Sequence, residues 1–222
     1  MTRLLLLALA AAACAVVVAA PIPEESDADR LYRLYGRWVH PHRSCKHQLV
    51  GSALRVALPA ESHALGHRAE APGNAPRTAT VVAGDFTVVV KVAVTPQPAA
   101  RSLAASAGLY AASDRDEFVT ARQYAGVGRE FTLQDHHLVP GRQLASMTAR
   151  AAAPAGAPLL RITRKGATAA TAWSEDGKNW NALYEHEVGW DERVTVGVFA
   201  ENRSGVPAGV TFDRFTLTQP KK

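Results

Sequence analysis

Alternation of apolar and polar side chains is the dominant pattern of this chain. In residues 85–95 every second side chain is apolar: Phe86, Val88, Val90, Val92 and Val94. Residues 193–200 repeat the alternation with valines at 194, 196 and 198. Successive side chains of a strand point to opposite faces, so each segment is predicted to be a strand with one face in a core.

The C-terminal segment 209–217 alternates too, but its parity changes. Val210 and Phe212 share one face, whereas Phe215 and Leu217 come one position out of step. One extra residue in a strand restores the apolar side chains to a common face. The pattern therefore predicts a β-bulge near Asp213 and Arg214.

Short turn signals separate pairs of apolar runs along the chain. They are Gly51-Ser52, Pro140-Gly141 and Asp176-Gly177, of which the last is the strongest hairpin signal. No amphipathic helix of about 12 residues lies among these runs. Such a series predicts an all-β fold, an antiparallel two-sheet sandwich. About a dozen strands are expected, more than the seven of a minimal immunoglobulin-like sandwich, and that number favours a jelly roll.

The N-terminal residues differ from the rest. Residues 1–20 run from Arg3 through a leucine and alanine stretch to small residues before Pro21, which is the pattern of a signal peptide. An uncleaved anchor, or lipidation at Cys14, is the alternative. Residues 21–37 are expected to form a linker or a short helix, with Ser26 and Asp29 at capping spacing, and residues 38–218 the sandwich domain. The predicted location is secreted, periplasmic or envelope-associated.

Composition excludes some function classes. The 222 residues carry a net charge of +5 and are 47% hydrophobic, which suits one globular domain. No basic block concentrates the charge, so a nucleic-acid partner is not expected. No second apolar run is long enough to span a membrane, so a span is expected only if the leader stays uncleaved.

Several short motifs occur in an order that resembles a known family. In the second half they are residues 159–166, 172–180, 194–200 and 210–215; upstream they are residues 74–77, 84–86, 107–110 and 116–119. The ordered set is similar to the DUF1349 family, whose members resemble concanavalin A-like lectins and glucanases. The resemblance implies a β-sandwich jelly roll, often secreted, without an established common activity. Carbohydrate binding is implied by analogy of fold.

One stretch departs from that family. Where its members tend to carry an acidic segment, this chain has His40-Pro-His-Arg-Ser-Cys45. Imidazole and thiolate are ligands that Zn or Cu prefers, so His40, His42, Cys45 and His47 form a weak candidate metal cluster. The alternative is a solvated polar stretch, and no cofactor is expected.

The acidic residues of the sequence lack a clear catalytic signature. Glycoside hydrolysis needs two carboxyl groups about 5 to 9 Å apart, and the Glu-x-Asp-x-x-Glu strand of the related glucanases is absent. The nearest substitutes are two clusters that solvated loop charge also explains: Asp114, Asp116 and Glu117, then Glu185, Glu187, Asp191 and Glu192. Ser174-x-Asp176-Gly177-x-x-Trp180 resembles a shortened Asp-box, which is expected to stabilise a hairpin. The protein is therefore predicted to be non-enzymatic.

Sugar binding needs aromatic rings beside planar polar groups. The candidate ligand-binding residues are Tyr110, Arg122, Tyr124 and Trp190, and Arg122 and Tyr124 share the parity of one strand. The predicted function is a secreted binding module that holds a polysaccharide or glycan on the concave sheet. The alternative is a structural or adaptor sandwich that binds a protein partner, and a glycosidase is a third possibility.

Overall fold

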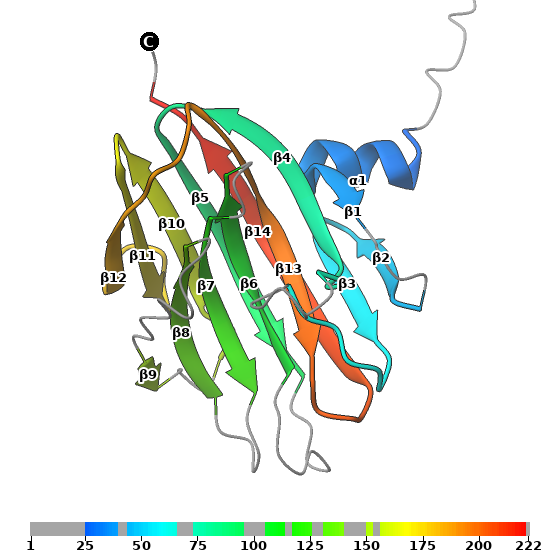
Figure 1. Ribbon diagram of the computed structural model, residues 1–222. Coiled ribbons are helices and arrows are strands. Elements are labelled where there is room, and N and C mark those ends of the chain that lie inside the picture. The colour runs from blue at the N-terminus through cyan, green and yellow to red at the C-terminus, as the bar shows by residue number, and fades with distance from the viewer. Residues whose placement is uncertain are drawn as a thin grey trace, which may run out of the picture.

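Two antiparallel sheets packed face to face make up the molecule, as the computed structural model shows in Figure 1. The structure describes residues 25–39, 44–65, 73–95, 105–113, 117–125, 131–139, 150–152 and 156–220. In these residues it contains one helix and fourteen strands, seven in each sheet. The all-β, two-sheet antiparallel sandwich expected from the alternation is confirmed. The predicted signal peptide and the Pro140-Gly141 turn lie outside the described residues.

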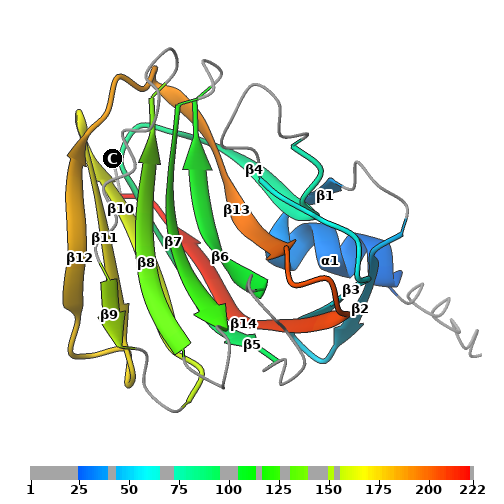
Figure 2. The same cartoon turned by 60° about the horizontal axis from the view of Figure 1, so that its bottom comes forward.

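Sheet A has the strand order β1-β4-β13-β6-β7-β8-β9. The bounds of its strands are β1 Arg37–Val39, β4 Arg77–Ala83, β6 Ala105–Ala112, β7 Phe118–Ala125, β8 Phe131–Leu138, β9 Arg150–Ala152 and β13 Arg193–Asn202. Sheet B has the order β12-β11-β10-β5-β14-β3-β2. Its strands are β2 Lys46–Val50, β3 Ala53–Leu58, β5 Phe86–Val94, β10 Leu159–Lys165, β11 Thr168–Ser174, β12 Asn181–Glu187 and β14 Ala208–Thr218. Figure 2 shows β6, β7 and β8 of sheet A in front of sheet B.

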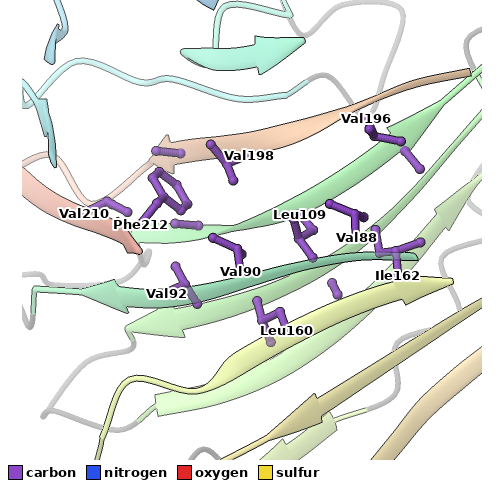
Figure 3. Packing of buried hydrophobic residues seen from close by; sticks show 14 of the residues in the cluster. Val88, Val90, Val92, Leu109, Leu160, Ile162, Val196, Val198, Val210 and Phe212 are labelled. Carbon is purple, nitrogen blue, oxygen red and sulfur yellow. The ribbon is translucent and has the colours of Figure 1, made fainter. Parts of the chain in front are cut away.

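The core lies between the sheets and follows the sequence alternation. Strand β5 buries every second residue, and Val88, Val90 and Val92 have no exposed surface. Valines from β13 face them from the other sheet, and Leu109 of β6 fills the space between (Figure 3). Burying one such side chain stabilises the fold by about 1.5–3 kcal/mol relative to leaving it in water. The core is therefore the main reason that the two sheets stay together.

The bulge in β14 is where the parity change predicts it. Pairing of β14 with β5 shifts register between Asp213 and Thr216, and Arg214 has a φ of 53°. Beyond the bulge, Phe215 packs against the core again, with its ring 5.4 Å from that of Tyr35. One extra residue thus keeps the apolar side chains of β14 on the interior side.

Helix α1, Asp27–Tyr35, closes one end of the sandwich beside β1 and β2 (Figure 1). Ser26 caps it, because its Oγ accepts a hydrogen bond from the Asp29 N–H at 3.1 Å. Leu31 and Tyr35 are buried, and the Tyr35 hydroxyl lies within hydrogen-bond distance of two carbonyls, at 2.8 Å from that of Ser52 and 2.9 Å from that of Phe212. The helix is thereby fixed to sheet B. None of the described helical residues forms a segment long and apolar enough to cross a membrane.

Candidate functional site

On the outer face of sheet A, two glycines allow neighbouring strands to come unusually close. A Cβ added to Gly108 of β6 would lie 2.0 Å from the Ala121 carbonyl oxygen of β7, and one added to Gly197 of β13 would lie 2.0 Å from the Thr78 carbonyl oxygen. Both positions face away from the core, as their parity with Tyr110 and Phe199 shows. Neighbouring backbones can approach so closely only where no side chain stands between them. The predicted ligand-binding residues Tyr110, Arg122 and Tyr124 share this side, and we call it the concave face after that prediction.

A buried ion pair lies at the centre of the concave face. The Arg122 guanidinium donates to Glu201 at 2.9 Å, from β7 to β13, and the two side chains are 0% and 2% exposed. The same carboxylate accepts from the Ser106 hydroxyl at 3.0 Å and from the Leu65 backbone N–H at 2.7 Å. A buried charge is tolerated when it is paired and hydrogen-bonded. Both charges are therefore held in place and neutralise each other.

Rings and hydroxyls from β7 and β13 surround Arg122. Thr120 accepts from its Nε at 3.1 Å and from Nη2 at 2.9 Å. The guanidinium carbon lies 4.9 Å from the centre of the Phe199 ring and 5.8 Å from that of Tyr124. Nη1 also lies 3.4 Å from the Tyr124 hydroxyl. Arg122 thus positions the ring of Tyr124 and does not itself reach solvent.

Next to this pair a strip of side chains is partly exposed. Strand β8 contributes Thr132, Gln134 and His136, which stand opposite Tyr124, Arg122 and Thr120 of β7. Gln134 links its neighbours, because its amide N lies 3.3 Å from the Thr132 hydroxyl and its amide O lies 3.1 Å from a His136 ring nitrogen. The rings of Tyr124 and His136 are stacked with centres 6.4 Å apart. We call Tyr124, Thr132, Gln134 and His136 the concave strip.

Tyr110 shares this face, but its side chain is buried. Its hydroxyl donates to the Thr78 carbonyl at 2.7 Å, and its ring meets Phe199 edge to face. Burial raises the pKa of Tyr110 to about 12. The ring belongs to the support beneath the concave face, and of the two predicted tyrosines only Tyr124 offers surface to a ligand.

Trp190 lies elsewhere, and here the sequence-based expectation changes. The residue is in the loop between β12 and β13, is 7% exposed and packs in the hydrophobic core. Arg164 lies over its ring at 5.9 Å and donates to its carbonyl. A tryptophan beside a glycine in a charged loop indicates exposure, but its large apolar surface favours burial. Trp190 and Tyr124 are therefore not brought together on one face.

The candidate metal ligands are only partly described, since His40 and His42 lie outside the described residues. Cys45 is a buried thiol that joins the core, and burial raises its pKa. The His47 ring packs against that of Trp38 in a tilted arrangement with centres 4.4 Å apart, and burial lowers the pKa of His47. Within the described part of the chain, no group of three or more His, Cys, Asp or Glu side chains is arranged to hold a metal ion.

Acidic residues gather inside the sandwich at its β8–β12 edge. Asp135 accepts from Thr171 at 2.7 Å and bonds His186 at 2.5 Å, and Glu117 bonds His137 at 2.8 Å. The two histidine rings lie 4.6 Å apart. Each carboxylate therefore has a partner within the protein: Asp135 ties β8 to β11 and β12 of the other sheet, whereas Glu117 bonds within sheet A. Glu185, Glu187, Asp191 and Glu192 are exposed away from this cluster, and Asp114 and Asp116 lie outside the described residues.

The Asp-box-like segment forms the β11–β12 hairpin. Asp176 accepts from the backbone N–H groups of Lys178 and Asn179, both at 2.8 Å, and Gly177 has a φ of 78°. These hydrogen bonds hold the pKa of Asp176 well below its usual range. Trp180 donates to the Gly177 carbonyl and covers Arg161. The predicted structural role in the hairpin is confirmed.

Glu201, Gln134 and His136 were not among the predicted site residues. Alternation in 131–136 separates Thr132, Gln134 and His136 from Phe131 and Leu133, so the sequence does contain a signal for the strip. The sequence contains no such signal for Glu201, because its partner Arg122 is 79 positions away along the chain.

Fold and concave face together define a β-sandwich similar in structure to carbohydrate-binding modules and to domains of carbohydrate-active enzymes. A functionally unknown protein from Saccharomyces cerevisiae superposes with a TM-score of 0.68 at 19% identity over 84% of this chain and 97% of that chain. A xylan β-1,4-xylosidase from Bacillus halodurans gives 0.60 at 16% identity over 92% of this chain but only 41% of the other. The carbohydrate-binding module CBM66 from Bacillus subtilis gives 0.50 at 12% over 82% and 95%.

These identities show likeness of fold alone. No protein-family model matches the chain, and no curated protein matches it.

Proposed function

We propose that this protein is a secreted, non-enzymatic binding module that holds a neutral carbohydrate on the concave strip. The observation that carries the proposal is the set of partly exposed groups on β7 and β8: the Tyr124 ring, the Thr132 hydroxyl, the Gln134 amide and the His136 imidazole. An aromatic ring packs against the C–H face of a sugar, and planar amides and imidazoles exchange hydrogen bonds with its hydroxyls.

Preorganisation supports the same function. Arg122 holds Tyr124 from beneath, and the Gln134 amide bridges Thr132 and His136. A site whose side chains are already ordered loses less entropy when it binds. The buried ion pair contributes no net charge to the face, since Glu201 neutralises Arg122. Neutral sugars therefore fit the strip better than acidic ones.

The non-enzymatic part of the proposal rests on where the carboxylates lie. Both oxygens of Glu201 are already bonded, to Leu65 and to Ser106 and Arg122. Asp135 and Glu117 face the interior between the sheets. A glycosidase needs a second carboxyl group beside the scissile bond, and the described part of the strip offers none.

Two further supports concern family and location. The ordered motifs in residues 74–215 resemble those of DUF1349, and we infer a relationship to that family. The leader pattern in residues 1–20 supports a place outside the cytoplasm.

Retention on immobilised neutral polysaccharides tests the proposal. We expect Tyr124→Ala to weaken binding about tenfold, the order of one lost ring contact, and Gln134→Ala to weaken it less. Tyr32→Ala is the matched control, because Tyr32 is an exposed tyrosine on α1. A panel without retention, or one in which Tyr32→Ala loses as much as Tyr124→Ala, contradicts the proposal and favours the adaptor alternative. Release of reducing sugar would instead indicate a glycosidase.

A further inference from the structure

A groove of about 560 Å³ lies on the opposite side of the molecule, on the outer face of sheet B, where β2, β3, β14 and the end of β5 run side by side. Strand register explains its shape. Lys46, Ala57, Gly209 and Thr95 stand in one row across the sheet. Ala57 and Gly209 carry almost no side chain, so the middle of the row is hollow. Longer side chains stand around this hollow.

The rim of the groove consists of hydrogen-bond donors. Gln48, Arg55 and Thr211 form the next row, and Lys46 and Thr95 flank the hollow. Lys46, Gln48, Arg55 and Thr95 are exposed, and Thr211 is partly so. Lysine and arginine supply only donors, whereas hydroxyls and an amide can donate or accept. Every polar side chain of the rim can therefore donate to one bound group.

Charge on the rim is not balanced by the groove itself. None of the residues that line it is acidic. Lys46 and Arg55 are diagonal neighbours on adjacent strands, a spacing of about 7–8 Å, so their charges repel. Among the described residues neither forms an ion pair, whereas Arg33 is paired with Glu25 and Arg122 with Glu201. The nearest carboxylate along β14 is Asp213, two positions beyond Thr211, and Ser52 donates to it at 3.2 Å.

His47 does not add to this charge. It lines the groove, but its parity differs from that of Lys46 and Gln48, and its ring lies against Trp38 with centres 4.4 Å apart; burial lowers its pKa. The two cations of the rim are Lys46 and Arg55. Two cations with three neutral polar groups around a shallow hollow match an oxyanion, which accepts from several donors at once.

We propose that this groove is a second binding site, which takes the carboxylate or sulfate groups of an acidic polysaccharide. It goes beyond the concave strip, since it lies on the other sheet and differs in charge. A chain with one anionic group on each sugar lays its acid groups over the hollow, where Lys46 and Arg55 approach from two adjacent strands. The flat floor at Ala57 and Gly209 leaves room for the sugar rings that connect the acid groups of the bound chain.

The test uses the full chain with heparin, polygalacturonate and neutral xylan as separate probes at fixed ionic strength. We expect the double variant Lys46→Gln, Arg55→Gln to bind heparin or polygalacturonate about tenfold more weakly, because charge-assisted hydrogen bonds are the strong ones. The matched control is Lys178→Gln, Arg193→Gln, which removes the same charge from exposed positions outside the groove. It should change affinity by less than about twofold. Ala57→Glu, which places a carboxylate in the hollow, should abolish binding.

Equal losses in the groove and control variants would overturn the proposal, because attraction by net charge alone would then explain binding. Unchanged affinity in both would overturn it as well. Heparin carries both sulfate and carboxylate groups, whereas polygalacturonate carries carboxylate alone. Binding of polygalacturonate therefore shows that carboxylate suffices, and binding of heparin without it shows that sulfate is needed. Tyr124→Ala separates the two sites, because it should leave heparin binding intact. The proposal for the groove can therefore fail without affecting the test of the concave strip, and the reverse also holds. A circular-dichroism melt of each variant establishes that it is folded.

Discussion

The two outer faces of the sandwich differ in where their charged side chains lie and whether they are paired. On sheet A the charges of Arg122 and Glu201 are buried and bonded to each other, and the neighbouring hydroxyls and amides are linked into one network. On sheet B the cations of Lys46 and Arg55 remain exposed around a hollow without a carboxylate. A face whose charges are paired with each other is neutral, whereas exposed cations without a carboxylate beside them attract an anion from solution. We therefore expect substitutions at the buried pair of sheet A to change mainly the free energy of unfolding, and substitutions at Lys46 and Arg55 of sheet B to change mainly anion binding.

Breaking the buried pair should produce the largest effect. Glu201→Ala leaves the Arg122 charge buried without its partner, and we expect it to lower the free energy of unfolding by about 3–5 kcal/mol. Arg55→Ala on the other face should change it by no more than about 0.5 kcal/mol. Urea denaturation measures both. The double variant Arg122→Met, Glu201→Leu should recover most of the loss, because it leaves no unpaired charge. If Glu201→Ala costs no more than Arg55→Ala, water reaches the pair and the contrast fails.

The close approach of β6 and β7 on the concave face should be the next most sensitive feature. Gly108→Ala places a Cβ 2.0 Å from the Ala121 carbonyl oxygen, so the two strands must move apart. We expect a loss of about 1–3 kcal/mol in unfolding free energy, the usual cost of overpacking, together with weaker glycan retention. Gly156→Ala, where nothing lies within 4 Å of the added Cβ, is the control. A stable Gly108→Ala protein with normal retention would show that this close approach is not needed.

Alkaline pH should reduce the stability that the buried Tyr110 contributes beneath the concave face, by a smaller amount than the two substitutions above. Burial raises the pKa of Tyr110 to about 12 from an ordinary value of 10.0. Its stabilising contribution is complete below about pH 10 and declines as pH rises towards 12, since only the unfolded chain releases the proton there. Tyr110→Phe should cost about 1 kcal/mol at neutral pH and make the alkaline decline shallower. Melting temperatures across this range measure both.

Tyr35 provides an internal comparison for that experiment. Burial raises its pKa to about 12 as well, so Tyr35→Phe should flatten the same part of the curve. An unchanged alkaline slope in both variants would contradict the assignment.

The smallest effect concerns His47 beside the groove. Because burial lowers its pKa below the ordinary 6.5, it should remain neutral as the pH falls from about 8 to 6.5. Heparin affinity at constant ionic strength should then stay level over this range. A clear rise towards the lower pH, absent in His47→Gln, would place the binding charge on the imidazole instead of on Lys46 and Arg55.

Strands and turns were accessible from sequence because local side-chain order determines them. Alternation identified β5, the parity change placed the bulge at Asp213, and Asp176-Gly177 predicted the β11–β12 turn. Strand β6 was less visible, since small residues occupy both of its faces, Ala105 and Ala107 on the core side and Ser106 and Gly108 on the outer side.

The site was accessible only in part. Parity put Arg122 and Tyr124 on one face, but the burial of Arg122 depends on Glu201, which arrives from β13 through the order of strands in sheet A. The positions of Tyr110 and Trp190 likewise depend on partners far along the chain. Contacts of this kind follow from topology, which no local pattern encodes.

Strand β14 lies between β5 and β3 in the middle of sheet B, although it is the last strand along the described chain. During synthesis of the chain, β3 and β5 are complete before β14 exists. Their facing edges therefore lack hydrogen-bond partners until residues 208–218 have been made. A nascent chain that stalls before Ala208 cannot close the sheet and exposes a valine-rich surface prone to self-association.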